Sequence, residues 1–239
     1  MKKIFILGVL CSVVAGCAGN EKILPERSVY EIYESAYSEF NNHNYDVAAE
    51  EFLNIENQYP ASAYTADALI MAAYSKYMDD DFPGTILIAD RFMRFHPGNK
   101  DVPYVLYLRG MAYYRQVSDV RREPGMSVYA LQQFENLVNR FPNSPYAKNA
   151  ENKIIILKNY IAGKVMFAAR DDMRNENWTS AITRLQSVVG TAQETVMTPE
   201  ALYRLTECYR AIGLESQANS YSEMLRKNFP DNEWTKKLK

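Results

Sequence analysis

Apolar and polar residues follow one another at helical spacing through most of the chain, and one arrangement of them occurs three times. In the stretch 45–60, apolar side chains return every three or four residues with acidic side chains between them, which predicts a helix with one buried face. From a small residue in this stretch, an aromatic residue follows four positions later and a proline twelve positions later. The full copies are Ala48, Phe52, Pro60 and Ala130, Phe134, Pro142, and a third copy, Ala218 to Pro230, has Ser222 in the middle. The recurrence predicts a chain built from repeated helical units.

This spacing resembles the second helix of a tetratricopeptide repeat (TPR), a helix pair of about 34 residues. Because one pair cannot bury its own apolar face, each pair packs on the next and the array forms one continuous core. We therefore expect an all-α fold, a TPR-type α-solenoid with about five helix pairs and so about ten helices. The expected helices span 28–41, 45–60, 62–78, 81–95, 102–117, a segment around Ala130, 144–175, 178–189, 199–212 and 214–229.

The stretch 144–175 stands out by its length. It has no proline after Pro145 and a single glycine, Gly163, over about thirty residues, more than twice the length of an average helix. We expect one long helix here, with Gly163 as the position for any bend. This helix begins a C-terminal half of two repeats, 144–239, which follows an N-terminal half of three repeats, 28–143.

The sequence SDVRREPG between Val117 and Gly125 interrupts the third repeat and lengthens it by about eight residues. An insertion at a turn between helices falls on one face of a solenoid and is often functional. Closing a longer surface loop costs little free energy, however. Two interpretations therefore remain: a functional loop, and a surface loop that the fold tolerates.

The first residues have the pattern of a secreted protein. Two lysines, Lys2 and Lys3, precede a short apolar run over 4–14, and small residues then lead to Cys17. This pattern resembles the signal of a bacterial lipoprotein, which implies that residues 1–16 are removed and that Cys17 carries the lipid. The alternative is an ordinary signal peptide in which Cys17 is incidental.

A lipid on Cys17 would make residues 17–27 a lipid-anchored tether ahead of the first helix. Two or three acyl chains anchor a protein stably, whereas one binds only marginally. An aspartate directly after the lipidated cysteine would resemble an inner-membrane retention signal, but this position is Ala18. We therefore expect the protein at the outer membrane, lipid-anchored and facing the periplasm.

Charge and motif content exclude several functions. The 27 basic and 29 acidic residues nearly balance, which gives no field for binding a nucleic acid. The sequence has no P-loop, zincin, paired CxxC or nucleophile-elbow motif, and His43 and His96 lie far apart without an acidic cluster. Cys208 lies in an apolar helical pattern and is expected in the core. We therefore expect no enzyme activity, no metal and no cofactor apart from the covalent lipid at Cys17.

Six longer strings carry a closer resemblance, and they follow one another through most of the chain after the tether. They are QYPASAY (58–64), IADRFMRFHP (88–97), PYVLYLRG (103–110), RREP (121–124), NRFPNSPYA (139–147) and WTSAITRL (178–185). Together with the lipoprotein signal and the five repeats, they resemble the BamD (ComL) family, the TPR lipoproteins of the outer-membrane β-barrel assembly (BAM) machinery.

The resemblance implies a scaffold that binds BamA, the barrel protein of this machinery, through its POTRA domain, with other BAM lipoproteins as further candidate partners. It also implies that the N-terminal repeats bind the C-terminal signal of unfolded outer-membrane proteins. Tyr59 falls where the family places a substrate-contacting tyrosine, but 61–63 (ASA) replaces the family's aromatic-Gly-Pro, and the alternative is a core tyrosine at a turn. Arg184 falls where the family has an arginine that faces the POTRA domain, and the alternative is an ordinary exposed arginine.

A second class of function is a periplasmic TPR adaptor that coordinates cell-wall synthesis or envelope constriction. Proteins of that class typically carry an N-terminal coiled coil. The tether of this chain is short and shows no heptads, which favours the assembly scaffold.

Overall fold

The computed structural model describes residues 27–117, 125–191 and 195–238, and within them the chain is all-α. The helices are α1 (Val29–Asn41), α2 (Tyr45–Gln58), α3 (Thr65–Met78), α4 (Phe82–Phe95), α5 (Val102–Arg115), α6 (Gly125–Arg140), α7 (Pro145–Arg174), α8 (Trp178–Thr191), α9 (Thr198–Ala211), α10 (Glu215–Asn228) and α11 (Glu233–Lys236). Ten of these match the predicted helices, and α11 is an additional single turn. The predicted fold class is confirmed.

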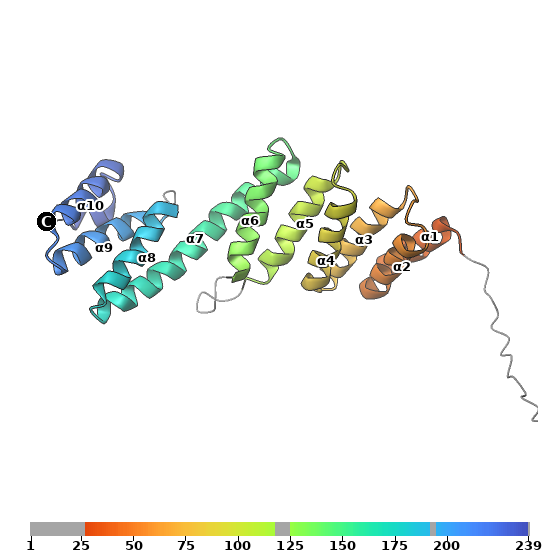
Figure 1. Ribbon diagram of the computed structural model, residues 1–239, viewed down its shortest axis with the longest axis horizontal. Helices are drawn as coiled ribbons and strands as arrows, with labels where there is room; N and C mark the ends of the chain where they lie inside the picture. Colours follow the sequence, from red (N-terminus) through yellow and green to blue (C-terminus); the bar gives the residue numbers. More distant parts are fainter. Residues whose placement is uncertain (1–26, 118–124, 192–194, 239) are drawn as a thin grey trace, which may run out of the picture.

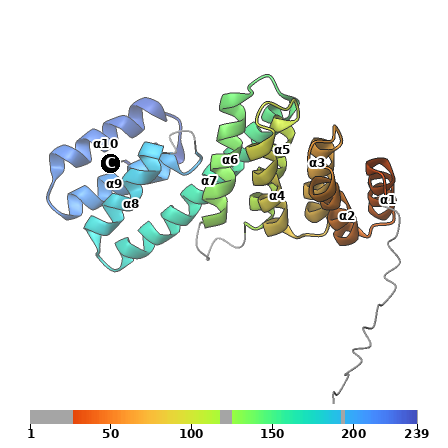
Figure 2. The same ribbon diagram turned by 45° about the vertical axis from the view of Figure 1, so that its right-hand side comes forward.

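The helices pack in the order of the chain, each against the next, from α1 at one end to α10 at the other. Figure 1 shows the resulting elongated array, and Figure 2 shows the same helices turned by 45°. Contacts between helices far apart in the chain are few. This is the quasi-one-dimensional arrangement of a solenoid, in which each pair is stabilised by its neighbours.

The repeated small and aromatic residues lie where the helices of a pair approach each other. Ala48, Phe52, Ala130 and Phe134 are fully buried. The ring of Phe134 packs so closely against Gly110 of α5 that a Cβ atom added there would lie 2.6 Å from the Phe134 Cε1 atom. A small residue opposite a large ring therefore sets the spacing of α5 and α6.

Local signals explain where several helices begin. Ser28 caps α1, and it forms a capping box with Glu31. The Asp81 side chain accepts a hydrogen bond of 2.9 Å from the Gly84 backbone N–H at the start of α4. Ser144 caps α7, with Pro145 in its first turn. The predicted start of α3 at residue 62 was too early, because the chain turns until Tyr64.

The buried side chains form two clusters, and α7 contributes to both. The first cluster runs from Ile32 of α1 to Leu157 of α7, and the second runs from Ala162 of α7 to Cys208 of α9. The helix continues without interruption through Gly163. The buried core thus changes from one cluster to the other inside α7. The division of the chain into two halves at residue 144 stays a prediction.

The last described residues pack on the array. Asn232 caps α11, and the Trp234 ring lies 5.3 Å from the Tyr203 ring of α9 between centroids. The Lys237 ammonium lies 3.7 Å above the Trp234 ring centroid. The short helix therefore covers the end of the solenoid with one aromatic side chain.

We expect Gly110→Ala to destabilise the fold, because the new methyl group overlaps the buried Phe134 ring. Overpacking of this kind costs about 1–3 kcal/mol, against a gain of up to about 1 kcal/mol in helix propensity. Gly163→Ala is the matched control, because its Cβ would meet only Met197 at 3.8 Å. Urea unfolding should show a lower midpoint for Gly110→Ala alone, and equal midpoints would contradict the close packing.

Candidate partner-binding surfaces

Tyr59 lies directly after α2, where its half-buried ring packs against the first core cluster. Its hydroxyl donates a hydrogen bond of 2.6 Å to the backbone carbonyl of Arg27. Its own carbonyl accepts a hydrogen bond of 2.9 Å from the Thr65 hydroxyl. These bonds give Tyr59 a structural role at the point where residue 27 leads into the fold. Its contact with substrate stays a prediction.

A second aromatic feature of the N-terminal half was not singled out from the sequence. Tyrosines on the first helix of successive pairs, or directly ahead of it, form a set that we call the tyrosine row: Tyr33, Tyr64, Tyr74, Tyr77, Tyr104, Tyr107 and Tyr146. The spacing of three residues between its members within α3 and within α5 is a helical signal that the sequence carries. The row connects α1, α3, α5 and the start of α7.

Ring contacts join some members of the row, whereas Tyr74 and Tyr77 contact the rings of Phe40 and Phe82. Tyr146 lies 5.2 Å from Tyr104 and 5.7 Å from Tyr107 between ring centroids, and Tyr33 lies 5.4 Å from Tyr64. The Tyr107 hydroxyl donates a hydrogen bond of 2.8 Å to Asn149. The row therefore presents large rings with polar ends, which suits contact with another protein chain.

Burial is the main cause of a raised pKa at Tyr104, and the neighbouring hydroxyls of Tyr74, Tyr146 and Tyr77 add to it. The Tyr104 hydroxyl therefore stays protonated at neutral pH and keeps its hydrogen for donation. The hydroxyls along the row offer donors and acceptors to a polar backbone.

Arg184 lies on the exposed side of α8. Its Nε atom pairs with the Asp172 carboxylate of α7 at 2.8 Å, and its side chain is 50% exposed while that of Asp172 is 18% exposed. Among the described residues, no other ion pair of Arg184 is present. The pair holds the guanidinium group at its Nε atom, and no ion pair is present at its two terminal nitrogens among the described residues.

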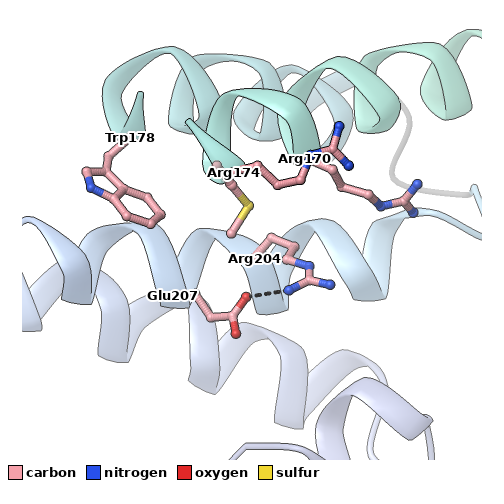
Figure 3. A pocket seen from close by; sticks show the side chains of 6 residues that line it. Arg170, Arg174, Trp178, Arg204 and Glu207 are labelled. Carbon is pink, nitrogen blue, oxygen red and sulfur yellow. Dashed lines mark hydrogen bonds and ion pairs between the residues drawn. The ribbon is translucent and has the colours of Figure 1, made fainter. Parts of the chain in front are cut away.

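A cavity of about 460 Å³ lies between α7, α8 and α9 on a different side of α7. Figure 3 shows the side chains that line it, which are Arg170, Met173, Arg174, Trp178, Arg204 and Glu207. Asp172 is two residues from both Arg170 and Arg174, which places it about half a turn away around the helix. The cavity and the Arg184–Asp172 pair therefore occupy different faces.

Glu200 holds the arginines of this cavity together. Its carboxylate accepts hydrogen bonds of 2.9 Å and 2.5 Å from Arg170, and one of 3.4 Å from Arg204. Arg204 also donates to Glu207 at 2.8 Å. Burial alone would raise the pKa of Glu200, but the bonds and charges of both arginines outweigh it and hold that pKa below its usual value. The network links α7 to α9.

Two sequence features lie outside the described residues: Cys17, with its signal and tether, and most of the insertion at 117–125. Cys208 is fully buried, as expected, and burial raises the pKa of its thiol to about 11. Within the residues that the structure describes, no group of three His, Cys, Asp or Glu side chains is placed to hold a metal ion. No helix there is long and apolar enough to span a bilayer.

Comparison with known families now adds to this geometry. Residues 25–237 match the model of the YfiO family, which is described as an outer membrane lipoprotein. The chain belongs to this family. The match covers both halves of the solenoid, from the end of the tether to the last helix.

Curated relatives point to the same family. The chain is 34% identical over 230 residues to the outer membrane protein assembly factor BamD of Caulobacter vibrioides. This alignment covers 95% of this chain and 75% of the relative. It is 32% identical over 237 residues to the protein of the same name in Rickettsia prowazekii, covering 98% and 93%. The BamD of Neisseria meningitidis serogroup A is 30% identical over 246 residues, covering 96% and 92%.

Among solved structures, the TPR domain of P58(IPK) overlaps with a TM-score of 0.47 at 14% identity, covering 87% of this chain and 53% of that chain. The repeat architecture of this YfiO family member rests on its own helix pairs and on the buried residues between them.

We expect Glu200→Gln to destabilise the fold by about 2–3 kcal/mol at neutral pH, because it leaves two partly buried arginines without their shared carboxylate. Since the folded-state pKa is depressed, the contribution of Glu200 is fully present above its unfolded pKa of about 4.3 and is lost as pH falls through the folded pKa. The difference in unfolding free energy between the two proteins should therefore be constant above about pH 5 and shrink below it. A difference that grows on acidification would contradict this network.

Proposed function

We propose that this member of the YfiO family is a non-catalytic scaffold of the outer-membrane β-barrel assembly machinery. A lipid on Cys17 holds it at the periplasmic face of the outer membrane. The observation that carries the proposal is the family match over 25–237, together with relatives named as outer membrane protein assembly factors. The solenoid supports a binding role, since stacked repeats offer an extended surface along their length.

In this proposal, the N-terminal half receives the C-terminal signal of unfolded outer-membrane proteins. The tyrosine row supports it, because aromatic side chains give a large contact area at a low cost in side-chain entropy. The strands of transmembrane barrels alternate apolar and polar residues. An extended segment of that kind needs contacts for alternate side chains along one wall. Tyr59 takes part at the edge of this half.

The C-terminal half binds the POTRA domain of BamA, and Arg184 makes the charged contact. The exposed guanidinium end of Arg184 supports this role, because arginine forms paired hydrogen bonds with a carboxylate and is enriched at the centre of interfaces. Asp172 orients the side chain from behind. Other BAM lipoproteins are further candidate partners, and a nucleic acid is not among them.

The adaptor of cell-wall synthesis is the second candidate, and no observation here favours it. The relatives are named for outer membrane protein assembly, which supports the scaffold instead.

Arg184→Glu should weaken binding to a purified BamA POTRA domain by about 2–5 kcal/mol, as expected when one partner of a desolvated charge pair is reversed. The free energy of unfolding should change by less than about 1 kcal/mol, because the pair with Asp172 is partly exposed. Calorimetric titration and urea unfolding measure the two effects.

Arg174→Glu is the matched control, since Arg174 also pairs with an aspartate of α7 and is 67% exposed on the cavity side. It should leave POTRA binding unchanged. Equal losses of binding in both variants, or a large loss of stability with Arg184→Glu, would show that Arg184 has no specific role at this interface.

A photoreactive residue at Tyr59 or Tyr64 should crosslink to a synthetic C-terminal peptide of a barrel protein, within about its last ten residues. The same residue at Tyr129 is the control, because Tyr129 is 50% exposed and lies outside the tyrosine row. Replacing the terminal aromatic residue of the peptide with alanine should lower the yield. Crosslinking that is as strong with a scrambled peptide would leave only the scaffold role.

Cys17→Ser should release the protein from the membrane as a soluble species with an unchanged melting temperature, because the anchor lies ahead of the folded repeats. Fractionation and circular dichroism measure both properties. The detection of an unmodified Cys17 in the mature wild-type protein by mass spectrometry would rule out the lipid anchor.

A further inference from the structure

One helix face in the N-terminal half is apolar and exposed. On α4, Leu87 and Phe95 are each 62% exposed, which makes them among the most exposed large apolar residues of the described chain. Arg91 and Arg94 lie between them, at steps of three and four residues. Residues at this spacing share one side of a helix. We call these four residues, Leu87, Arg91, Arg94 and Phe95, the α4 face.

The apolar residues of the α4 face protrude, while the opposite side of the helix is in the core. Ile88, Ala89 and Phe92 are buried against the neighbouring helices, so α4 needs no help from Leu87 or Phe95 to pack. Large apolar side chains that the fold leaves outside are a sign of contact with a partner or a membrane.

One cation of the α4 face has no ion pair among the described residues. Asp90, the acidic residue of α4, pairs with Arg109 of α5 at 3.0 Å. Arg91 pairs with Glu56 of α2 at 2.9 Å, which balances its charge, whereas Arg94 is exposed and has no such partner. On the adjacent helix α2, Glu51 is also neutralised, by Arg27 at 2.8 Å. The face therefore combines two exposed apolar side chains with one unbalanced positive charge, that of Arg94.

The α4 face lies beside the entry of the chain into the fold. A hollow of about 850 Å³ is lined by the α4 face with His96, and by four residues from the end of α2 to the start of α3, which are Glu56, Asn57, Pro60 and Thr65. Pro60 directly follows Tyr59, whose hydroxyl holds the backbone of Arg27. Arg27 follows Cys17 by ten positions, and ten residue steps span at most about 36 Å when fully extended.

We propose that the α4 face rests on the anionic phospholipid surface of the membrane that holds the anchor. Leu87 and Phe95 enter the interfacial region, and Arg94 contacts the phosphate groups of the lipids. This inference rests on the proposed function, because the lipid on Cys17 brings the first two repeats to the membrane. The second contact fixes which side of the N-terminal half faces the lipid.

The exposure of the face favours a membrane over a peptide. A peptide-binding groove buries most of its apolar lining in recesses that receive the side chains of the ligand. Leu87 and Phe95 border the hollow but are each 62% exposed, and the cationic Arg94 lies beside Phe95. Exposed apolar side chains next to a cation are typical of helices that lie at a membrane interface. Because a short acylated tether already holds the protein on the membrane, the local concentration of lipid at the face is high.

The test is a fluorophore placed on the α4 face of the lipidated full-length mature protein. Leu87→Cys provides a single site for labelling, because Cys208 is fully buried and Cys17 is acylated in the proposed mature form. The labelled protein is incorporated in vesicles of phosphatidylethanolamine and phosphatidylglycerol that carry nitroxide-labelled acyl chains. We expect the nitroxides to quench the fluorophore strongly.

Val196→Cys is the control for exposure, since Val196 is 74% exposed and lies ahead of α9, in the other half. It should be quenched far less. Adding Arg94→Ser to the Leu87→Cys protein should shift the contact equilibrium about fivefold toward the free state, the effect of one cation near an anionic surface. Phe95→Ser should lower the quenching further, and unchanged melting curves will show that these variants fold.

The outcomes separate this inference from the proposed anchor. Protein that floats with the vesicles but is quenched equally at positions 87 and 196 would overturn the membrane contact and leave the anchor intact. Protein that does not float would overturn both. Quenching that persists on pure phosphatidylcholine, or a fluorophore at position 87 that a barrel peptide shields in the absence of vesicles, would show that the face is not built for anionic lipid.

Discussion

The continuity of α7 through both buried clusters is the constraint on which the rest of the structure depends. Its first half packs in the cluster that ends at Leu157, and its second half packs in the cluster that begins at Ala162. A helix of 30 residues extends about 45 Å and resists bending. Surfaces on the two halves are therefore held in a fixed relation, which a flexible linker between two domains would not provide.

Both halves contain arginines tied to carboxylates, and the tyrosine row runs along α1, α3, α5 and the start of α7. In the C-terminal half, ion pairs tie α8 and α9 to α7. Glu200 fastens α9 to α7, and Asp172 fastens α8 to α7 through Arg184. A partly exposed pair such as Arg184–Asp172 adds little stability, but it fixes the direction of a side chain that a partner meets.

Most of the fold could be predicted from the sequence, because its signals are local. The positions of Ala48, Phe52 and Pro60 set a helix and its end, and the absence of breakers around Gly163 marks the long helix. The partners of single side chains could not be predicted in this way. The bonds of Tyr59 to Arg27 and of Arg184 to Asp172 join residues that only the packed repeats bring together. The contact of Trp234 with Tyr203 was missed for the same reason, since a short polar tail gives no helical period.

The central claim is that this solenoid joins the barrel-assembly machinery, and the identity of its stable partner tests the claim most directly. The tagged mature protein can be purified from mildly solubilised outer membranes, and the proteins that stay with it in equal amounts can be identified by mass spectrometry. The account predicts BamA as the main partner. Recovery of cell-wall synthesis proteins in stoichiometric amounts, without BamA, would contradict it.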